Sequence, residues 1–441
     1  MNFLLVEYAI LLTGLFILGA VFGSMLNVGI YRLPREDNLW KALKFMFHPP
    51  SHCPRCLVPI RFYDNIPILG WLKLGGRCRN CRGKIAVRYP LIEALTGLLF
   101  VLLYVAEVPS QWGWKALQES SLWHLYGPAD ALSPLALANV RYACHLVLLI
   151  ALIVATFIDF DLRVIPDSVT VPTMVIGALA NTILGDVFIV PLWYQTPAMA
   201  GAAWGYFIPF RDVLSAPAWG WLNNWPHYLG VPQWMIAHPH WHGLCVSLAG
   251  IVVGGGSIWA VRLAGQWALQ REAMGFGDVM LMAMIGSFIG WQGTLMVFAL
   301  AIGLSVMVAL PAALRRRDHE LPYGPYLAGG TLILLLAGRW IWPWFDVHFL
   351  AMGPLLIPMA LFLMGSLALM LLAWRTIQRR LGWGPPAEEW IEEARWDPGD
   401  QLAYLANQTS DDQHGRWRSD SWPGQSAARG QSQYRQWRYG G

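Results

Sequence analysis

The chain has 441 residues, of which 56% are apolar and only 13% are charged. This composition is typical of membrane proteins and argues against an ordinary soluble globular protein. The net charge of +4 is modest, so we expect no nucleic-acid partner.

Nine apolar runs are long enough, or nearly so, to cross about 30 Å of hydrocarbon. The runs lie near residues 8–30, 91–107, 136–158, 168–185, 244–264, 278–291, 293–311, 325–341 and 348–374. The least certain pair meets at Trp291, Gln292 and Gly293, and its first run is short. We therefore expect an all-α polytopic membrane protein with about eight to nine transmembrane helices. The first helix has no basic residue before it, which favours an uncleaved helix over a signal peptide.

Positive charge in the loops predicts the orientation of these helices. From Arg32 to Arg88 there are twelve Lys or Arg residues against three Asp or Glu, so this loop should be cytoplasmic. Alternation from there puts the basic run 315–317 on the same side. The same alternation places Asp159 and Asp278 together at the cytoplasmic boundary.

The first loop carries two Cys-x-x-Cys pairs, Cys53 with Cys56 and Cys78 with Cys81, separated by 21 residues. This spacing is typical of a four-thiolate zinc site. Two disulfides are the alternative, and a reducing cytoplasm disfavours them. With four protein ligands the ion would have no open position. We therefore expect structural zinc in a small cytoplasmic zinc-ribbon-like loop domain.

Two carboxylate motifs lie at membrane edges. Asp159 and Asp161 follow one apolar run, and Asp278 opens another in the sequence Gly275-Phe276-Gly277-Asp278. Ionisable groups at such positions are costly and point to function. Two carboxyls in a partly dry site can share a proton, one acting as base toward water and the other as acid toward a carbonyl oxygen. The motif at Asp278 taken alone is weak, since an Asp that caps a helix would also fit it.

Two segments stand apart from this pattern. Residues 186–243 form a predicted external insertion rich in Trp and Pro, which we expect to be re-entrant or to lie on the membrane surface. It carries four histidines whose spacing gives only weak support for a metal site: His227, His238, His240 and His242. Residues 381–441 are rich in Gly, Ser, Gln and Arg and are predicted to be a disordered cytoplasmic tail.

Taken together, these motifs resemble one family, the bacterial prepilin peptidases, which are membrane aspartic proteases. The resemblance covers about residues 15–335, the insertion excepted. Besides the cysteine pairs and the two Asp motifs, it rests on Gly23-Ser24-Met25-Leu26-Asn27, Tyr63-Asp64-Asn65-Ile66-Pro67, Arg88-Tyr89-Pro90 with Glu93, and Pro322-Tyr323-Gly324-Pro325-Tyr326. Such agreement in one order makes a chance match very improbable.

The resemblance implies that Asp159 and Asp278 are the catalytic pair. It gives Asp161 a supporting role as a partner or water-orienting group, and Glu272 a role in positioning substrate. Gly275 and Gly277 would bring backbone close to the carboxylate or the bound peptide. Asp167 would cap the next helix.

The family implies prepilin or pseudopilin substrates from type IV pilus or type II secretion systems. Their leaders are cut after a Gly on the cytoplasmic face of the bacterial inner membrane. Many members then methylate the new N-terminus with S-adenosylmethionine, but no residue here is predicted to bind that donor. The alternatives are a peptidase without methylation, a presenilin-like intramembrane protease, and a non-enzymatic membrane assembly protein.

The domain boundaries follow from the same reasoning. We expect a first transmembrane helix in 1–31, the cytoplasmic four-cysteine domain in 32–90, and the peptidase domain with its insertion in 91–345. An extra transmembrane helix, 346–380, and the tail lie outside the family pattern. Another departure is Met280, which stands where the family commonly has Lys.

Overall fold

The structure is a computed structural model, and it describes residues 2–35, 41, 44, 50–53, 56, 58–108, 134–185, 187–194, 232–269, 274–314 and 322–381. Its α-helices are α1 (Asn2–Arg32), α3 (Leu69–Lys73), α4 (Arg88–Glu107), α6 (Pro134–Leu162), α7 (Asp167–Leu184), α11 (Gln233–Ala237), α12 (Pro239–Leu269), α13 (Phe276–Leu314), α14 (Gly324–His348) and α15 (Leu356–Leu381). Short 3-10 helices are η1 (Leu33–Arg35), η2 (Phe62–Asp64) and η7 (Leu350–Leu355). These ranges contain no β-strand, only two isolated bridges.

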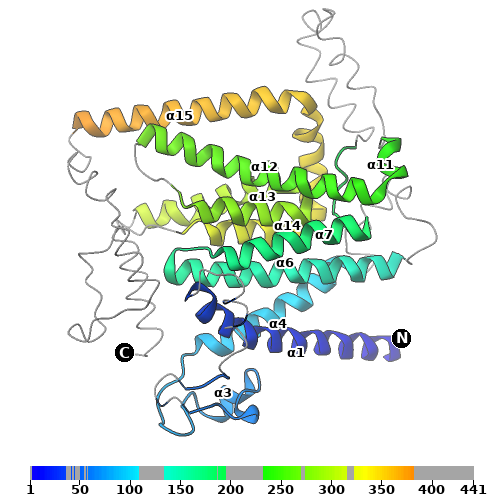
Figure 1. The fold of residues 1–441 in the computed structure, drawn as a ribbon, viewed down its shortest axis with the longest axis vertical. Helices are drawn as coiled ribbons and strands as arrows, with labels where there is room; N and C mark the ends of the chain where they lie inside the picture. Colours follow the sequence, from blue (N-terminus) through cyan, green and yellow to red (C-terminus); the bar gives the residue numbers. More distant parts are fainter. Residues whose placement is uncertain are drawn as a thin grey trace, which may run out of the picture.

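Long helices dominate the molecule and lie side by side (Figure 1). Within the described ranges, seven of them are long and apolar enough to cross a membrane: α1, α4, α6, α7, α12, α13 and α15. The 25 residues of α14 also suffice for a crossing, but Arg339 and Asp346 make its second half more polar. The predicted all-α polytopic fold is therefore confirmed.

One of these seven helices, α13, contains two segments. Gly290 has a left-handed φ of 74° and interrupts the helix. A Cβ placed on Gly254 of α12 would lie 2.6 Å from the Met282 oxygen and 2.9 Å from the Thr294 Cγ2. In a straight helix those two residues would be about 18 Å apart. The chain therefore reverses at Gly290, and the predicted division of this stretch into two spans is correct.

The two halves of α13 pack closely on α12 because small residues meet at the contact. A Cβ on Gly286 would lie 2.1 Å from the Gly250 oxygen, and one on Gly250 would lie 1.9 Å from the Gly286 oxygen. Neither position has room for a side chain, since backbone occupies the space on both sides. This contact fixes the depth of α13 in the bundle, and with it the depth of the carboxylate at its start.

Both ends of the predicted insertion are attached to the bundle. The four residues 187–190 are buried, and the Gln292 side chain donates a hydrogen bond to the Pro191 oxygen at 2.8 Å. The Leu192 N–H donates to the His242 Nε2 at 2.9 Å. The central part of the insertion, including His227, and the tail 382–441 lie outside the described residues.

Candidate active site and metal centre

Asp159 and Asp278 lie on different helices and come together at one end of the bundle. Asp159 is three residues from the end of α6, and Asp278 is the third residue of α13. Their exposed fractions are only 5% and 9%. Both sites adjoin Ile165 in the turn after α6: a Cβ on Gly277, next to Asp278, would lie 2.9 Å from the Ile165 Cβ, and one on Gly324, which is bonded to Asp159, would lie 3.1 Å from the Ile165 Cδ1. The fold thus brings the two motifs to the same end of the bundle, and their catalytic pairing stays a prediction.

The turn after Asp159 explains why α6 ends there. Arg163 adopts a left-handed φ of 55°, and its backbone N–H donates a hydrogen bond to the backbone carbonyl oxygen of Asp159 at 2.9 Å. Pro166 follows and cannot continue the helix with a backbone donor. Asp167 is the first residue of α7, where its negative charge interacts favourably with the positive end of the helix dipole. The helix cap is Pro166 without a side-chain bond, so the prediction that Asp167 caps α7 is wrong.

A third element holds the Asp159 carboxylate in place. The Gly324 N–H, at the start of α14, donates to the Asp159 Oδ2 at 3.1 Å. A Cβ on Gly324 would lie 2.6 Å from that oxygen, so only glycine lets the backbone approach. Sequence reasoning noted the Pro322–Tyr326 motif but gave Gly324 no role. The sequence feature that could have indicated a role for Gly324 is its place between two Pro-Tyr pairs of a recognisable motif.

The two glycines before Asp278 differ in their surroundings. A Cβ on Gly277 would lie 2.9 Å from the Ile165 Cβ, so this glycine lets α13 begin directly against the turn that follows α6. Around Gly275 the nearest atoms lie at 3.9 and 4.0 Å, the latter being the Asp278 Oδ2. Gly277 therefore allows close packing of α13 on Ile165, whereas Gly275 leaves open space beside the Asp278 carboxylate.

Asp161 makes an ion pair that joins two helices. Its Oδ1 accepts a hydrogen bond from the Arg88 guanidinium at 2.7 Å, and the same guanidinium lies 5.0 Å from the centre of the Phe157 ring. Arg88 begins α4, so the pair connects the first residue of α4 to the last turn of α6. Glu272 lies outside the described residues, and its predicted role stays a prediction.

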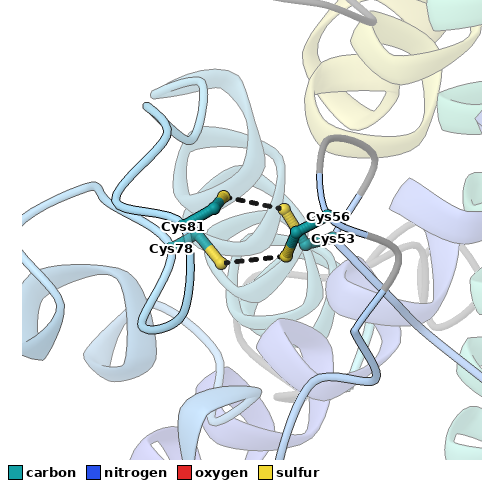
Figure 2. Close-up of side chains that lie close together, drawn as sticks. All are labelled: Cys53, Cys56, Cys78 and Cys81. Atoms are coloured by element: carbon teal, nitrogen blue, oxygen red, sulfur yellow. Dashed lines mark hydrogen bonds between the residues drawn. The ribbon is translucent and has the colours of Figure 1, made fainter.

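The four cysteines of the first loop converge on one point (Figure 2). Their sulfurs all lie within 4.8 Å of one another, with 3.8 Å between those of Cys53 and Cys81 and 4.0 Å between those of Cys56 and Cys78. Tetrahedral Zn–S bonds of about 2.3 Å imply S–S distances of about 3.8 Å. All four thiols are free rather than paired in disulfides. The donor set therefore fits a metal ion of this kind.

Local backbone geometry prepares these sulfurs for a cation. Isolated bridges, His52 with Pro59 and Arg77 with Lys84, close each Cys-x-x-Cys turn. The Val58 N–H donates to the Cys56 sulfur, which is the main cause that lowers the pKa of this thiol to about 6. The pKa of the Cys78 thiol is lowered as well, chiefly by the Cys81 N–H. Thiolates are the form that binds metal.

The histidines of the insertion show no comparable grouping. Among the residues that the structure describes, the four cysteines are the single set of three or more His, Cys, Asp or Glu side chains placed to hold a metal ion. His242 uses its Nε2 to accept the Leu192 N–H, and the His240 Nδ1 lies 3.0 Å from the Thr182 oxygen.

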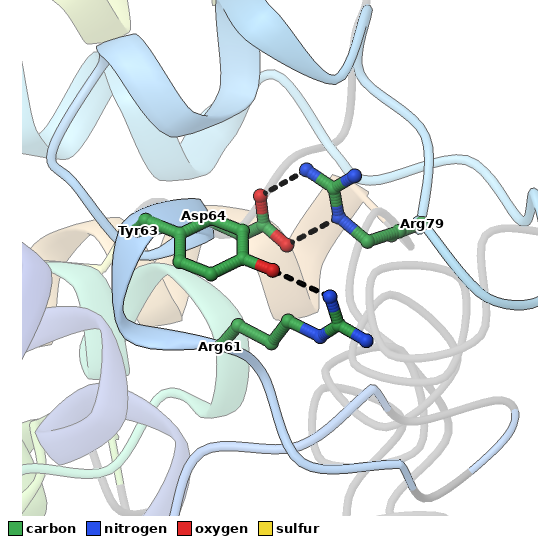
Figure 3. Close-up of polar contacts among 4 residues, drawn as sticks. All are labelled: Arg61, Tyr63, Asp64 and Arg79. Atoms are coloured by element: carbon green, nitrogen blue, oxygen red, sulfur yellow. Dashed lines mark hydrogen bonds and ion pairs between the residues drawn. The ribbon is translucent and has the colours of Figure 1, made fainter.

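The loop between the cysteine pairs has an ion pair at its centre (Figure 3). The Arg79 guanidinium donates two hydrogen bonds to the Asp64 carboxylate, at 2.6 and 2.7 Å. These bonds are the main reason that the pKa of Asp64 lies below its usual value. Arg79 stands between Cys78 and Cys81, so the pair ties η2 to the second cysteine turn.

Buried polar side chains attach this loop domain to the helices. The Glu93 carboxylate in α4 accepts a hydrogen bond from the Ile68 N–H at 2.6 Å, and the Asn27 amide in α1 donates to the Tyr89 oxygen at 3.2 Å. In Figure 1 α3 accordingly lies beside α1 and α4. Sequence reasoning noted Asn27 and Glu93 within motifs but assigned them no role.

Comparison with known proteins gives two family matches. Residues 17–106 match the bacterial peptidase A24 N-terminal domain, and residues 146–310 match the type IV leader peptidase family. Prepilin leader peptidase/N-methyltransferase of Aeromonas salmonicida (strain A449) is 28% identical over 351 residues, covering 75% of this chain and 92% of that protein. The protein of the same description from Myxococcus xanthus (strain DK1622) is 32% identical over 312 residues, covering 69% and 66%. No solved structure matches this chain.

The relatives and the helices agree on a multi-pass membrane protein. The first matched range contains the four cysteines and the second contains both Asp159 and Asp278, whereas the Pro322–Tyr326 motif lies beyond it. The chain belongs to the type IV leader peptidase family.

Proposed function

We propose that this chain is a membrane aspartic endopeptidase that removes the leader peptide of type IV prepilins or type II secretion pseudopilins. Asp159 and Asp278 are its catalytic pair. The observation that carries the proposal is that these two buried carboxyl groups lie at one end of the bundle on either side of Ile165, with the Gly324 N–H bonded to Asp159. Relatives that are named prepilin leader peptidase/N-methyltransferase support the same substrate class.

The pair performs hydrolysis by sharing one proton. The ionised carboxylate takes a proton from water as the water oxygen bonds to the scissile carbonyl carbon, while the protonated carboxyl donates to the carbonyl oxygen. When the C–N bond breaks, the proton taken from water passes to the leaving amine, and the other carboxylate takes back a proton from a hydroxyl of the tetrahedral intermediate as the C=O bond re-forms. The Gly324 N–H stabilises negative charge on Asp159, which favours Asp159 as the ionised member.

The four cysteines would hold a structural zinc ion. Four thiolates fill its coordination sphere, so the ion supplies folding energy to the loop domain and leaves no position for substrate. Methylation of the new N-terminus with S-adenosylmethionine follows cleavage in this proposal. It rests on the relatives' names and on the intact cysteine domain. No described residue is assigned to the methyl donor.

The reaction takes place on the cytoplasmic face of the bacterial inner membrane. Arg88 lies at the same end of the bundle as the Asp pair. It is also the last residue of the first loop, counted from Arg32 to Arg88, which has twelve basic residues against three acidic ones. The basic leader of a prepilin would stay on this side for the same reason. Its hydrophobic stem would remain in the bilayer.

The test uses purified full-length protein in liposomes with a prepilin substrate. Asp159→Asn and Asp278→Asn should each abolish cleavage, because an amide can neither act as base nor share the proton. The exposed Asp167 at the start of α7 provides the matched control, and the Asp167→Asn variant should cleave the prepilin at the normal rate. Full processing by either of the first two variants would remove that residue from the pair.

Mass spectrometry of the product separates the remaining possibilities. An added methyl on the new N-terminus supports the second activity, and its absence leaves a peptidase alone. Replacing the substrate's last leader Gly with a bulky residue should block cutting. A cut inside the apolar stem instead would favour the presenilin-like alternative, and no cut with any pilin-like substrate would favour a non-enzymatic protein.

A further inference from the structure

The loop domain exposes an unusual amount of apolar surface for a water-facing domain. Four large side chains in and around η2 and α3 are largely exposed: Phe62 at 85%, Leu69 at 62%, Leu72 at 59% and Ile66 at 46%. Leu69 and Leu72 are three residues apart on α3 and so share one side of it. Gly70 faces away from them, since a Cβ there would meet the Asp64 oxygen of η2.

The position of α3 along α4 follows from one hydrogen bond. The Ile68 N–H donates to Glu93, which lies five residues after the start of α4. Five residues of helix rise about 7.5 Å. Ile68 and the start of α3 are therefore level with the second turn of a transmembrane helix. On that turn Leu91 is 61% exposed, as expected for a side chain that faces lipid.

Positive charge surrounds Tyr63, the neighbour of Phe62, and Figure 3 shows two of these cations, Arg61 and Arg79, beside its ring. Three cations surround the Tyr63 ring, with Lys73 at 5.3 Å, Arg79 at 5.5 Å and Arg61 at 5.9 Å from its centre. Asp64 is the carboxylate of this group and is ion-paired with Arg79, so the cluster keeps a net positive charge. Apolar side chains beside excess Lys and Arg are the features of a surface that lies on anionic lipid.

We propose that the exposed side chains of Phe62, Leu69 and Leu72 lie in the headgroup layer of the bilayer, with Lys73 and Arg61 on anionic lipid phosphates. The polar layer on each side of the hydrocarbon is several ångströms thick, which matches the depth set by Glu93. A second copy of the chain is a poorer occupant, because a two-fold contact would bring like cationic clusters together. The loop domain is then a peripheral membrane anchor as well as a metal-binding domain.

Site-specific photocrosslinking of the full chain in nanodiscs tests this placement. Benzoylphenylalanine replaces Phe62, Leu69 or Leu72, one at a time, and mass spectrometry identifies what each position captures. Leu98, exposed in the middle of α4, is the positive control for lipid capture, and the exposed Lys84 outside η2 and α3 is the negative control. We expect phospholipid adducts at the three patch positions and at 98, but not at 84.

Three results would overturn the proposal. These are no lipid adduct at the patch while position 98 is labelled, crosslinks between two copies of the chain, or equal lipid capture at position 84. A second measurement tests the charge, using nanodiscs of mixed phosphatidylcholine and phosphatidylglycerol. Lys73→Gln should lower the preference for phosphatidylglycerol adducts at position 72 by about fivefold. An unchanged preference would contradict the assignment of Lys73 to lipid phosphates.

Discussion

Replacement of Gly324 by alanine tests whether the start of α14 controls the proposed catalytic pair. The added Cβ would lie 2.6 Å from the Asp159 Oδ2 and 3.1 Å from the Ile165 Cδ1, so the carboxylate or the helix must move. The N–H bond at 3.1 Å would be lost or lengthened. A hydrogen bond to a charged group contributes about 1.5–3 kcal/mol. The expected loss in kcat is therefore about 10- to 150-fold.

The assay is the rate of prepilin cleavage in liposomes, measured over a range of substrate concentrations. KM should change little, because Gly324 acts on the carboxylate rather than on the leader. Gly303 in the second half of α13 is the matched control, since a Cβ there meets nothing within 4 Å, and Gly303→Ala should keep full activity. Cleavage by Gly324→Ala within twofold of the unchanged protein, at normal protein levels, would refute the reasoning.

Three further predictions follow from other contacts. Cys56→Ser should release the metal ion from the loop domain. In the unchanged chain, elemental analysis should find one zinc per protein at neutral pH, and the affinity for zinc should fall as the pH drops below about 6, because protons then compete with the ion for the Cys56 sulfur. Asp161→Asn should weaken the bond to Arg88 yet retain measurable cleavage. An inactive Asp161→Asn beside an active Asp159→Asn would make Asp161 the catalytic member instead. Gly286→Val should lower the free energy of unfolding by about 1–3 kcal/mol in thermal denaturation, whereas Gly256→Val, in open space, should cost far less.

The parts of the site that sequence predicts well are those encoded by short spacings. The two Cys-x-x-Cys pairs predict a four-sulfur cluster because each turn presents two sulfurs to the same side, and the structure brings them within 4.8 Å. The apolar runs beside Asp159 and Asp278 predict two membrane-edge carboxylates for a similar reason. Alternating loop charge then suffices to place both at one face.

The contacts that escaped prediction join residues far apart in the chain. Gly324 and Asp159 are separated by 165 positions, and Arg88 and Asp161 by 73. No local periodicity records which helix end meets which carboxylate, because that depends on how the helices pack. The reversal at Gly290 could be predicted only in part. The sequence shows an interruption of the apolar run at 291–293, but the backbone break lies just before it.

The reversal at Gly290 also affects how a substrate reaches the carboxyl groups. The first half of α13, from Phe276 to Gly290, is about 21 Å long, shorter than the roughly 30 Å hydrocarbon layer. With Gly290 at the far surface of that layer, Asp278 would lie inside the layer rather than at its near surface. The apolar stem of the proposed prepilin substrate would begin at a similar depth. Raising one turn of that stem into water would cost several kcal/mol, at about 0.8 kcal/mol per exposed CH₂. For the proposed substrates, a short helix removes that extraction step, because the scissile bond meets the carboxyl pair while the stem stays in lipid.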